Sequence, residues 1–207
     1  MCKAIVFSIA ILAGGTLAAC GSDHDHDDVE ASAIEQGTTR GQALQAQAAQ
    51  ELAGCTESEA IARAAGVVFA IHNGEIAQAQ FVLSKTANPG VRNLATQIVA
   101  DHQASNVALM TLLHNRGLAP VETSVSRTLT SEASAGLAQL QAGELRNLHI
   151  DYTQMQISMH QEASLIVGTV RDSMPASAAE LRGFLTDTLT VIDKHLTHAE
   201  AVLRDLP

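Results

Sequence analysis

Four long segments of this 207-residue chain carry apolar residues at helical spacing, and they constrain its fold more than any other feature. The clearest runs from residue 94 to residue 116; the others span about 56–86, 144–172 and 177–204. In each, residues three or four positions apart form one apolar stripe, with a His or Glu near mid-length. Such stripes are typical of helices that pack one face into a shared core. In the clearest segment the stripe consists of Leu94, Ile98, Leu109, Leu112 and Leu113.

Turn signals divide these segments into two pairs. Asn88-Pro89-Gly90 separates the first segment from the second, and Met174-Pro175 separates the third from the fourth. At the start of the first segment, Thr56 and Glu59 have the spacing of a capping box. Each pair is therefore expected to form a helical hairpin.

The connection between the two hairpins is long, from residue 117 to about 143, and we expect one short helix within it at 131–140. An up-down-up-down bundle does not need such a connection, whereas a ferritin-like bundle has one. We therefore predict an all-α fold, a ferritin-like four-helix bundle spanning residues 57–207.

Residues 1–19 have the features of a bacterial export signal. Lys3 precedes an apolar run at 4–12, and small residues lead up to Cys20. This pattern resembles the lipobox of bacterial lipoproteins, which implies cleavage before Cys20 and acylation of that residue. By resemblance to lipoprotein sorting, Gly21 favours an outer-membrane anchor with the domain facing the periplasm. The alternatives are an ordinary secretory signal and a membrane anchor, although the apolar run is short for a membrane span.

Residues 20–56 are predicted to be a flexible tether. Residues 23–28 alternate Asp with His, which is typical of a solvated linker and also compatible with weak cation binding. Residues 42–53 contain strong helix formers but almost no large apolar side chains, so a helix there need not pack.

Charge and composition exclude one broad class of partner. The formal net charge is −10, which opposes binding to phosphate backbones. Aromatic residues make up only 2% of the chain, so it has few platforms on which bases could stack. Nucleic acid is therefore not an expected ligand.

Several short motifs resemble one known family. They are Val67–Ala77 (VVFAIHNGEIA), Asp101-His102, Tyr152 followed eight residues later by His160, and Asp193-Lys194-His195-Leu196. They look like the domain of unknown function 4142, predicted ferritin-like modules of exported bacterial proteins, over about residues 61–203. One departure is Leu148-His149, where the family usually has Phe-Asp. The role of that Asp is not carried over to His149.

One polar residue in each predicted helix lies toward the interior side: Glu75, His102, His160 and His195. Imidazoles with a carboxylate suit Zn, Cu or Fe, and bundle interiors are where such sites are built. His72 could extend this set. The alternative interpretation is that these residues form hydrogen-bonded pairs, Glu75 with His102 and Tyr152 with His195, that only fix helix register.

Counting from the turns tests which ligands lie at one level. Glu75 is thirteen residues before Asn88 and His102 fourteen after it, so these two are level. His160 is fourteen residues before Met174, whereas His195 is twenty-one after it. At about 1.5 Å per residue, that count offsets His195 from His160 by roughly 10 Å. The count predicts a pair of Glu75 and His102, joined by His160, with His195 outside.

Motifs of well-known enzymes are missing from the sequence. No His has a Glu three residues before it, as a di-iron ferritin-like site requires, and HExxH, GxSxG and glycine-rich phosphate loops do not occur. Met155 and Met159 flank His160 and favour either a soft copper site or core packing. No substrate can be named.

Two functional hypotheses follow. The first is a non-enzymatic, lipid-anchored bundle that binds a divalent metal in envelope metal or stress homeostasis. The second is a structural module of the cell envelope, which binds no metal and meets a protein partner or a second copy of itself.

Overall fold

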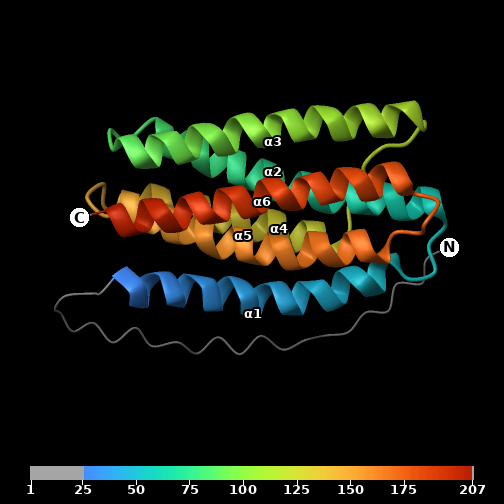
Figure 1. The fold of residues 1–207 in the computed structure, drawn as a ribbon, viewed down its shortest axis with the longest axis horizontal. Helices are drawn as coiled ribbons and strands as arrows, with labels where there is room; N and C mark the ends of the chain where they lie inside the picture. The colour runs from blue at the N-terminus through green and yellow to red at the C-terminus, as the bar shows by residue number, and fades with distance from the viewer. Residues whose placement is uncertain (1–25, 207) are drawn as a thin grey trace.

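The computed structural model describes residues 26–206, which form six α-helices and no strand (Figure 1). The predicted all-α class is confirmed for this part of the chain. The predicted signal peptide, Cys20 and residues 23–25 of the Asp/His run lie outside the described residues. The helices are α1 (His26–Leu52), α2 (Glu57–Leu83), α3 (Pro89–Asn115), α4 (Ser124–Ala142), α5 (Leu148–Ser173) and α6 (Ala179–Asp205).

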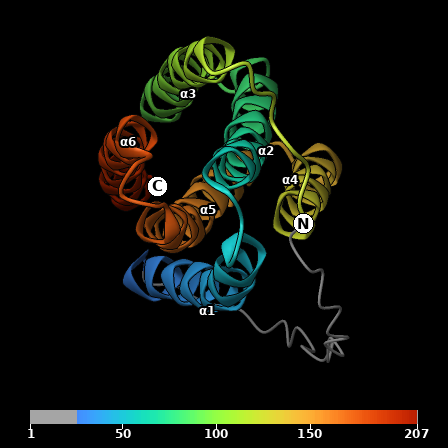
Figure 2. The same cartoon turned by 90° about the vertical axis from the view of Figure 1, so that its right-hand side faces the viewer.

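Four of these helices correspond to the four predicted segments and surround a common interior. In the end-on view of Figure 2, α2 lies beside α3 and α5 beside α6, while α3 contacts α6 and α2 contacts α5. The other two helices lie outside this group. α4 packs on the outer side of α2, and α1 packs mainly along α5. The described chain therefore has six helices: the four of the predicted bundle, α4 in the connection where a shorter helix was expected, and α1, which was not expected to pack.

The hairpin helices begin where the turn chemistry predicts. The Thr56 hydroxyl accepts a hydrogen bond from the Glu59 amide, and the Glu59 carboxylate accepts one from the Thr56 amide, which completes the capping box of α2. At the start of α3, the Asn88 side chain caps the Val91 amide and Pro89 occupies the first turn. These contacts satisfy amide groups that helix starts otherwise leave unpaired.

Helix α1 is the main departure from the predicted organisation, because residues 26–52 were expected to belong to a flexible tether. Its buried stripe consists largely of small residues: Ala33, Gly37, Gly41, Leu44, Ala48 and Leu52. A Cβ added at Gly37 would lie only 2.1 Å from the Ser158 carbonyl oxygen of α5. The glycines therefore let two backbones approach closely, and contact between backbones takes the place of large side chains.

The connection between the hairpins is also more helical than predicted, since α4 covers Ser124–Ala142 rather than 131–140. Thr123 and Ser126 form a second capping box, which starts the helix earlier. By contrast, α5 begins only at Leu148 and not at residue 144 as predicted, so Leu145 lies before the helix and is 66% exposed.

A buried polar layer divides the apolar interior into two clusters. One cluster includes Val68, Leu109 and Leu185, and the other includes Val82, Leu94 and Leu203. On α2, α3, α5 and α6 alike, the chain passes from one cluster to the other at mid-length. The fully buried polar residues of this layer are His72, Glu75, Gln78, His102, Gln156, His160 and His195.

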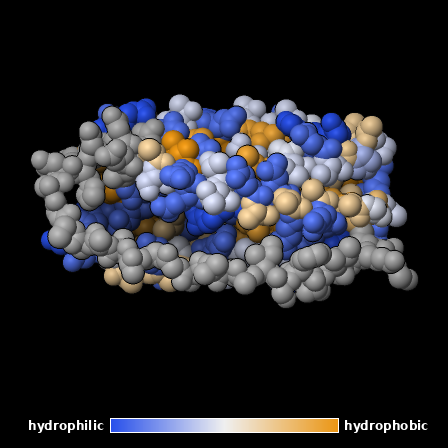
Figure 3. All heavy atoms as spheres, turned by 90° about the horizontal axis from the view of Figure 1, so that it is seen from below, coloured by the Kyte–Doolittle hydropathy of each residue, from blue (hydrophilic) through white to orange (hydrophobic). Residues whose placement is uncertain are grey.

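None of the described helices is both long and apolar enough to span a membrane. On the face seen from below in Figure 1, hydrophilic and hydrophobic side chains are interspersed (Figure 3). Large apolar side chains with high exposure include Val107 and Leu145.

Candidate metal centre

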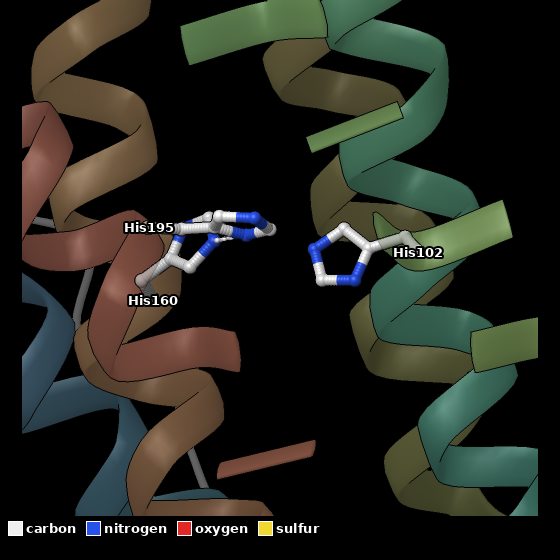
Figure 4. Close-up of side chains that lie close together, drawn as sticks. All are labelled: His102, His160 and His195. Carbon is white, nitrogen blue, oxygen red and sulfur yellow. Dashed lines mark hydrogen bonds between the residues drawn. The ribbon is translucent and has the colours of Figure 1, made fainter. Parts of the chain in front are cut away.

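The polar layer brings together the four residues predicted as metal ligands, one from each helix of the two hairpins. Glu75 comes from α2, His102 from α3, His160 from α5 and His195 from α6, and all four are fully buried. Figure 4 shows His160 and His195 side by side, with the His102 ring across from them. One ligand atom from each of these three histidines lies within 4.8 Å of the other two.

The predicted offset of His195 from His160 is therefore wrong. His160 Nε2 lies 3.3 Å from His195 Nδ1. His160 is thirteen positions before Ser173, the last residue of α5, and His195 is sixteen positions after Ala179, the first residue of α6. That difference of three positions is only about 4.5 Å along a helix. The sequence count had assigned the whole turn, residues 174–178, to the α6 side.

The outer nitrogens of these two rings each face an oxygen. His160 Nδ1 is 2.8 Å from the Gln156 carbonyl oxygen, and His195 Nε2 is 3.0 Å from Asp101 Oδ2. Both oxygens are acceptors, so both outer nitrogens donate a proton. A neutral imidazole has only one N–H. The inner nitrogens, His160 Nε2 and His195 Nδ1, consequently present lone pairs to each other across 3.3 Å.

A third ring proton would relieve the repulsion between the two lone pairs, but burial disfavours the positively charged imidazole that it would create. Burial lowers the pKa of His160 to about 4, with the Glu75 charge acting in the opposite direction. Burial likewise lowers the pKa of His195, opposed by its hydrogen bond with Asp101. Two neutral rings whose lone pairs face each other do not form a hydrogen bond, but they have the chemistry to serve as a pair of metal ligands.

The spacing of the two nitrogens suits a tetrahedral ion. Two nitrogens at the usual Zn–N distance of about 2.0–2.1 Å from one tetrahedral ion lie about 3.3 Å apart. The observed separation of 3.3 Å matches this value. The Asp101 carboxylate behind His195 is the kind of outer partner that orients a ligating imidazole.

Glu75 places a carboxylate beside this centre, outside the group of three histidine nitrogens that lie within 4.8 Å of one another. Its Oε2 is 2.5 Å from His102 Nε2, and its Oε1 is 3.7 Å from His160 Nδ1. The predicted Glu75–His102 contact is thus observed. Despite the short distance, neither carboxylate oxygen and neither His102 nitrogen makes a hydrogen bond of favourable geometry within the part of the chain that the structure describes. Burial also lowers the pKa of His102 to about 4, so this ring is neutral near pH 7.

His72 extends the layer by stacking on His102, with ring centroids 4.5 Å apart. Its Nδ1 is 2.8 Å from Asn106 Oδ1, and the Asn106 amide nitrogen donates to Asn73. His72 Nδ1 is therefore the donor, and its buried Nε2 has no hydrogen-bond partner. Burial lowers the pKa of His72 to about 4.

Tyr152 does not pair with His195, as the packing interpretation had expected. Its buried hydroxyl has no hydrogen-bond partner among residues 26–206, while His195 contacts His160 and Asp101 instead. Burial, aided by the nearby charge of Glu75, raises the pKa of Tyr152, so the phenol stays protonated.

Two buried glutamines that the sequence analysis did not single out complete the layer. Gln156 donates to Gln78 Oε1 at 3.0 Å, and Gln78 donates to the Ala133 carbonyl oxygen at 3.1 Å. These bonds connect α5 to α2 and α2 to α4. Their sequence signal is their spacing, since Gln78 is three residues after Glu75 and Gln156 four before His160.

Beyond Glu75, the interior opens into a cavity of about 630 Å³ between α1, α2, α4 and α5. Met155 and Met159 line this cavity, so these sulfurs are on a different face of α5 from His160. Glu162 lines it too, and burial together with Glu132 raises the pKa of Glu162 to about 7. His198, three residues after His195 on α6, contacts Gln97 and is not part of the centre.

Comparison with known proteins places the chain in a family without assigning it an activity. The family described as "Domain of unknown function (DUF4142)" matches residues 29–202. The chain belongs to this family, and the match includes most of α1, a helix that the resemblance had left outside. No curated protein matches the chain, and no solved structure does.

Proposed function

We propose that this chain binds one divalent transition-metal ion at the buried centre, with Glu75, His102, His160 and His195 as ligands. The observation that carries the proposal is the facing pair of unprotonated nitrogens, His160 Nε2 and His195 Nδ1. Apposed lone pairs in a buried site cost free energy unless a cation lies between them. The tetrahedral spacing favours Zn²⁺; Cu²⁺ and Fe²⁺ are the other first-row ions to test.

The fold we propose for this centre is a ferritin-like bundle of α2, α3, α5 and α6, with α4 in the connection and α1 added outside. One ligand from each of four helices in two hairpins is the arrangement that such bundles use for metals. The Glu-x-x-His pairs of di-iron sites are missing from the sequence. The proposal is therefore a single-ion, non-enzymatic centre.

We further propose that the protein is a lipoprotein acylated at Cys20, anchored to the outer membrane with its domain in the periplasm. The support is the lipobox-like sequence that ends in Cys20 and the following Gly21. A protein at that location with a buried metal centre would serve in envelope metal or stress homeostasis. Incorporation of labelled fatty acid, lost in Cys20→Ser, tests the anchor.

Metal content tests the centre. The full chain, purified without chelator, is expected to contain one metal ion per molecule by elemental analysis. His102→Ala and His160→Ala are expected to lose it, whereas His114→Ala, which changes an exposed His of α3, keeps it. Metal-free protein whose thermal stability is unchanged by Zn²⁺, Cu²⁺ or Fe²⁺ would contradict the proposal.

That contrary result would favour the second function, a structural module of the envelope. The observation behind it is that His195 and Asp101 already join α6 to α3 without an ion. Under this function His102→Ala lowers the free energy of unfolding by about 1–3 kcal/mol, with no effect of metal.

A further inference from the structure

The cavity between α1, α2, α4 and α5 connects the molecular surface with the metal centre. Its lining includes exposed residues, such as Ser32, Gln36 and Gln139, and also the fully buried Glu75 and Gln78. Glu75 is the one of the four proposed ligands that lines the cavity. Its carboxylate therefore borders the cavity and contacts His102 as well.

The charged groups along this cavity are mostly acidic. Glu75, Glu132, Asp151 and Glu162 line it, against a single base, Arg40. Arg40 Nε is 3.6 Å from Glu162 Oε2, and the Arg40 guanidinium also contacts the Ser158 hydroxyl. The lining has four formal negative charges and one positive charge, which attracts cations.

Glu132 and Glu162 both line this cavity together with Glu75, and their carboxyl groups are close enough to interact electrostatically. Glu162 is only 4% exposed, yet its Oε1 has no hydrogen-bond partner in the described chain, and the same holds for the buried Glu132 Oε2. Buried carboxylate oxygens without a donor are suited to coordinate a hard or borderline cation.

The opposite side of the centre is less suited to cation approach. There Asp101 stands behind His195, and Lys194 Nζ lies 2.9 Å from Asp101 Oδ2. The ammonium group, whose side chain is 51% exposed, neutralises Asp101 and opposes an incoming cation.

We propose that divalent cations reach the centre through this cavity, and that Glu132 and Glu162 bind the ion transiently before it passes to Glu75. This inference rests on the proposed metal-binding function and adds a second, weaker cation site. Carboxylates at this position raise the local cation concentration and replace part of the hydration shell that the ion loses on entering the bundle.

The rate of Co²⁺ binding tests the route. Tetrahedral Co²⁺ absorbs visible light, so stopped-flow absorbance follows its arrival at the histidines of the metal-free full chain. The double variant Glu132→Gln/Glu162→Gln is expected to bind at least about tenfold more slowly. Its dissociation slows in parallel, so the dissociation constant changes much less. The control, Glu122→Gln/Glu144→Gln, removes two charges whose side chains are 69% and 62% exposed, and its rate stays within about twofold of the unmodified chain.

Two further variants keep the test decisive if the double variant folds poorly. Ala135→Phe narrows the exposed rim of the cavity and is expected to slow binding as well. Lys194→Gln is expected to leave the rate unchanged. Faster binding in Lys194→Gln, with unchanged rates in the cavity variants, would overturn this route and indicate access between α3 and α6. Failure of the unmodified chain to bind Co²⁺ would overturn the proposed function itself.

Discussion

His160 Nε2 faces His195 Nδ1 at 3.3 Å. Each neutral ring donates its one N–H to an oxygen on its other side, His160 to the Gln156 carbonyl and His195 to the Asp101 carboxylate. The three contacts Gln156–His160, His160–His195 and His195–Asp101 thus contain only two ring protons, and the contact between the rings has none. A cation between the rings, either the proposed metal ion or a third proton, would remove the repulsion between the two lone pairs. Because burial disfavours the proton, the metal is the better occupant.

The Asp101–His195 hydrogen bond should contribute to metal affinity although Asp101 is not a ligand. Asp101→Ala is expected to lower Zn²⁺ affinity by about 10–100-fold, because the His195 ring loses the acceptor that fixes its orientation. Competition with a chromophoric chelator measures the change.

Gln97→Ala is the matched control for that variant. It removes a similar contact across α3 and α6, the 2.9 Å bond to His198, from a histidine outside the centre. Equal losses of affinity in both variants would show that the Asp101 effect is not specific.

Acidification should destabilise the metal-free protein. His72, His102 and His160 have pKa values lowered by burial to about 4 from an ordinary value of 6.5. Between these pH values the unfolded chain takes up protons that the folded chain does not. The free energy of unfolding therefore falls as the pH drops from about 6.5 to about 4, by roughly a few kcal/mol for each ring.

Glu162 acts in the opposite direction, since its pKa is raised to about 7 from 4.5. It adds stability as the pH falls from about 7 to 4.5, but one carboxyl does not offset three imidazoles. Urea denaturation of chelator-treated protein at pH 7.5 and pH 5 measures the net effect. Glu162→Gln should steepen the loss, and stability that is constant or rises on acidification would contradict the neutral assignment of the histidines.

Gly37 of α1 should tolerate alanine worse than the helical glycines Gly168 and Gly183. Gly37→Ala is expected to lower the free energy of unfolding by more than about 1 kcal/mol, because its Cβ would overlap the Ser158 carbonyl oxygen. Gly168→Ala and Gly183→Ala are the controls, since a Cβ at either position meets nothing within 4 Å. They should stabilise their helices by about 0.5–1 kcal/mol. Thermal unfolding compares the three, and a neutral Gly37→Ala would argue against close packing of α1.

Removing the Tyr152 hydroxyl should not cost stability. The group is buried without a hydrogen-bond partner, so Tyr152→Phe removes a polar atom that gains nothing from folding. We expect the free energy of unfolding of the metal-free protein to stay constant or rise by up to about 1 kcal/mol. A loss of more than 1 kcal/mol in urea denaturation would show that the hydroxyl has a partner in solution.

Much of the bundle could be predicted from the sequence because its signals are local. The capping box at Thr56 and the Asn88-Pro89 start of α3 are readable from adjacent residues, and counting from that tight turn correctly brings Glu75 level with His102. The same count failed for His195, although both turns are five residues long, 84–88 and 174–178. It started from the last residue of the first turn and from the first residue of the second, and the contribution of a turn to helix depth cannot be read from the sequence.

The position of α1 could not be predicted by hydrophobic periodicity. Its contact with α5 depends on Gly37 and Gly41, residues that usually indicate a poor helix. The advantage of a glycine at these positions becomes visible only when the position of the α5 backbone is known. The same holds for the cavity, whose acids come from α2, α4 and α5 and have no common motif.

The glycine-mediated contact of α1 also defines the smallest fragment that can be studied. A chain that starts at residue 57 would keep the four helices around the histidines but would uncover α5 along the stripe where α1 lies. Ser158 and Glu162, now buried beside Gly37 and Gly41, would face water, and the cavity would lose the side provided by Ser32, Ala33 and Gln36. Truncation at the predicted tether would thus uncover this side of α5 and open the proposed route to the centre. Functional work therefore requires the chain from the start of α1.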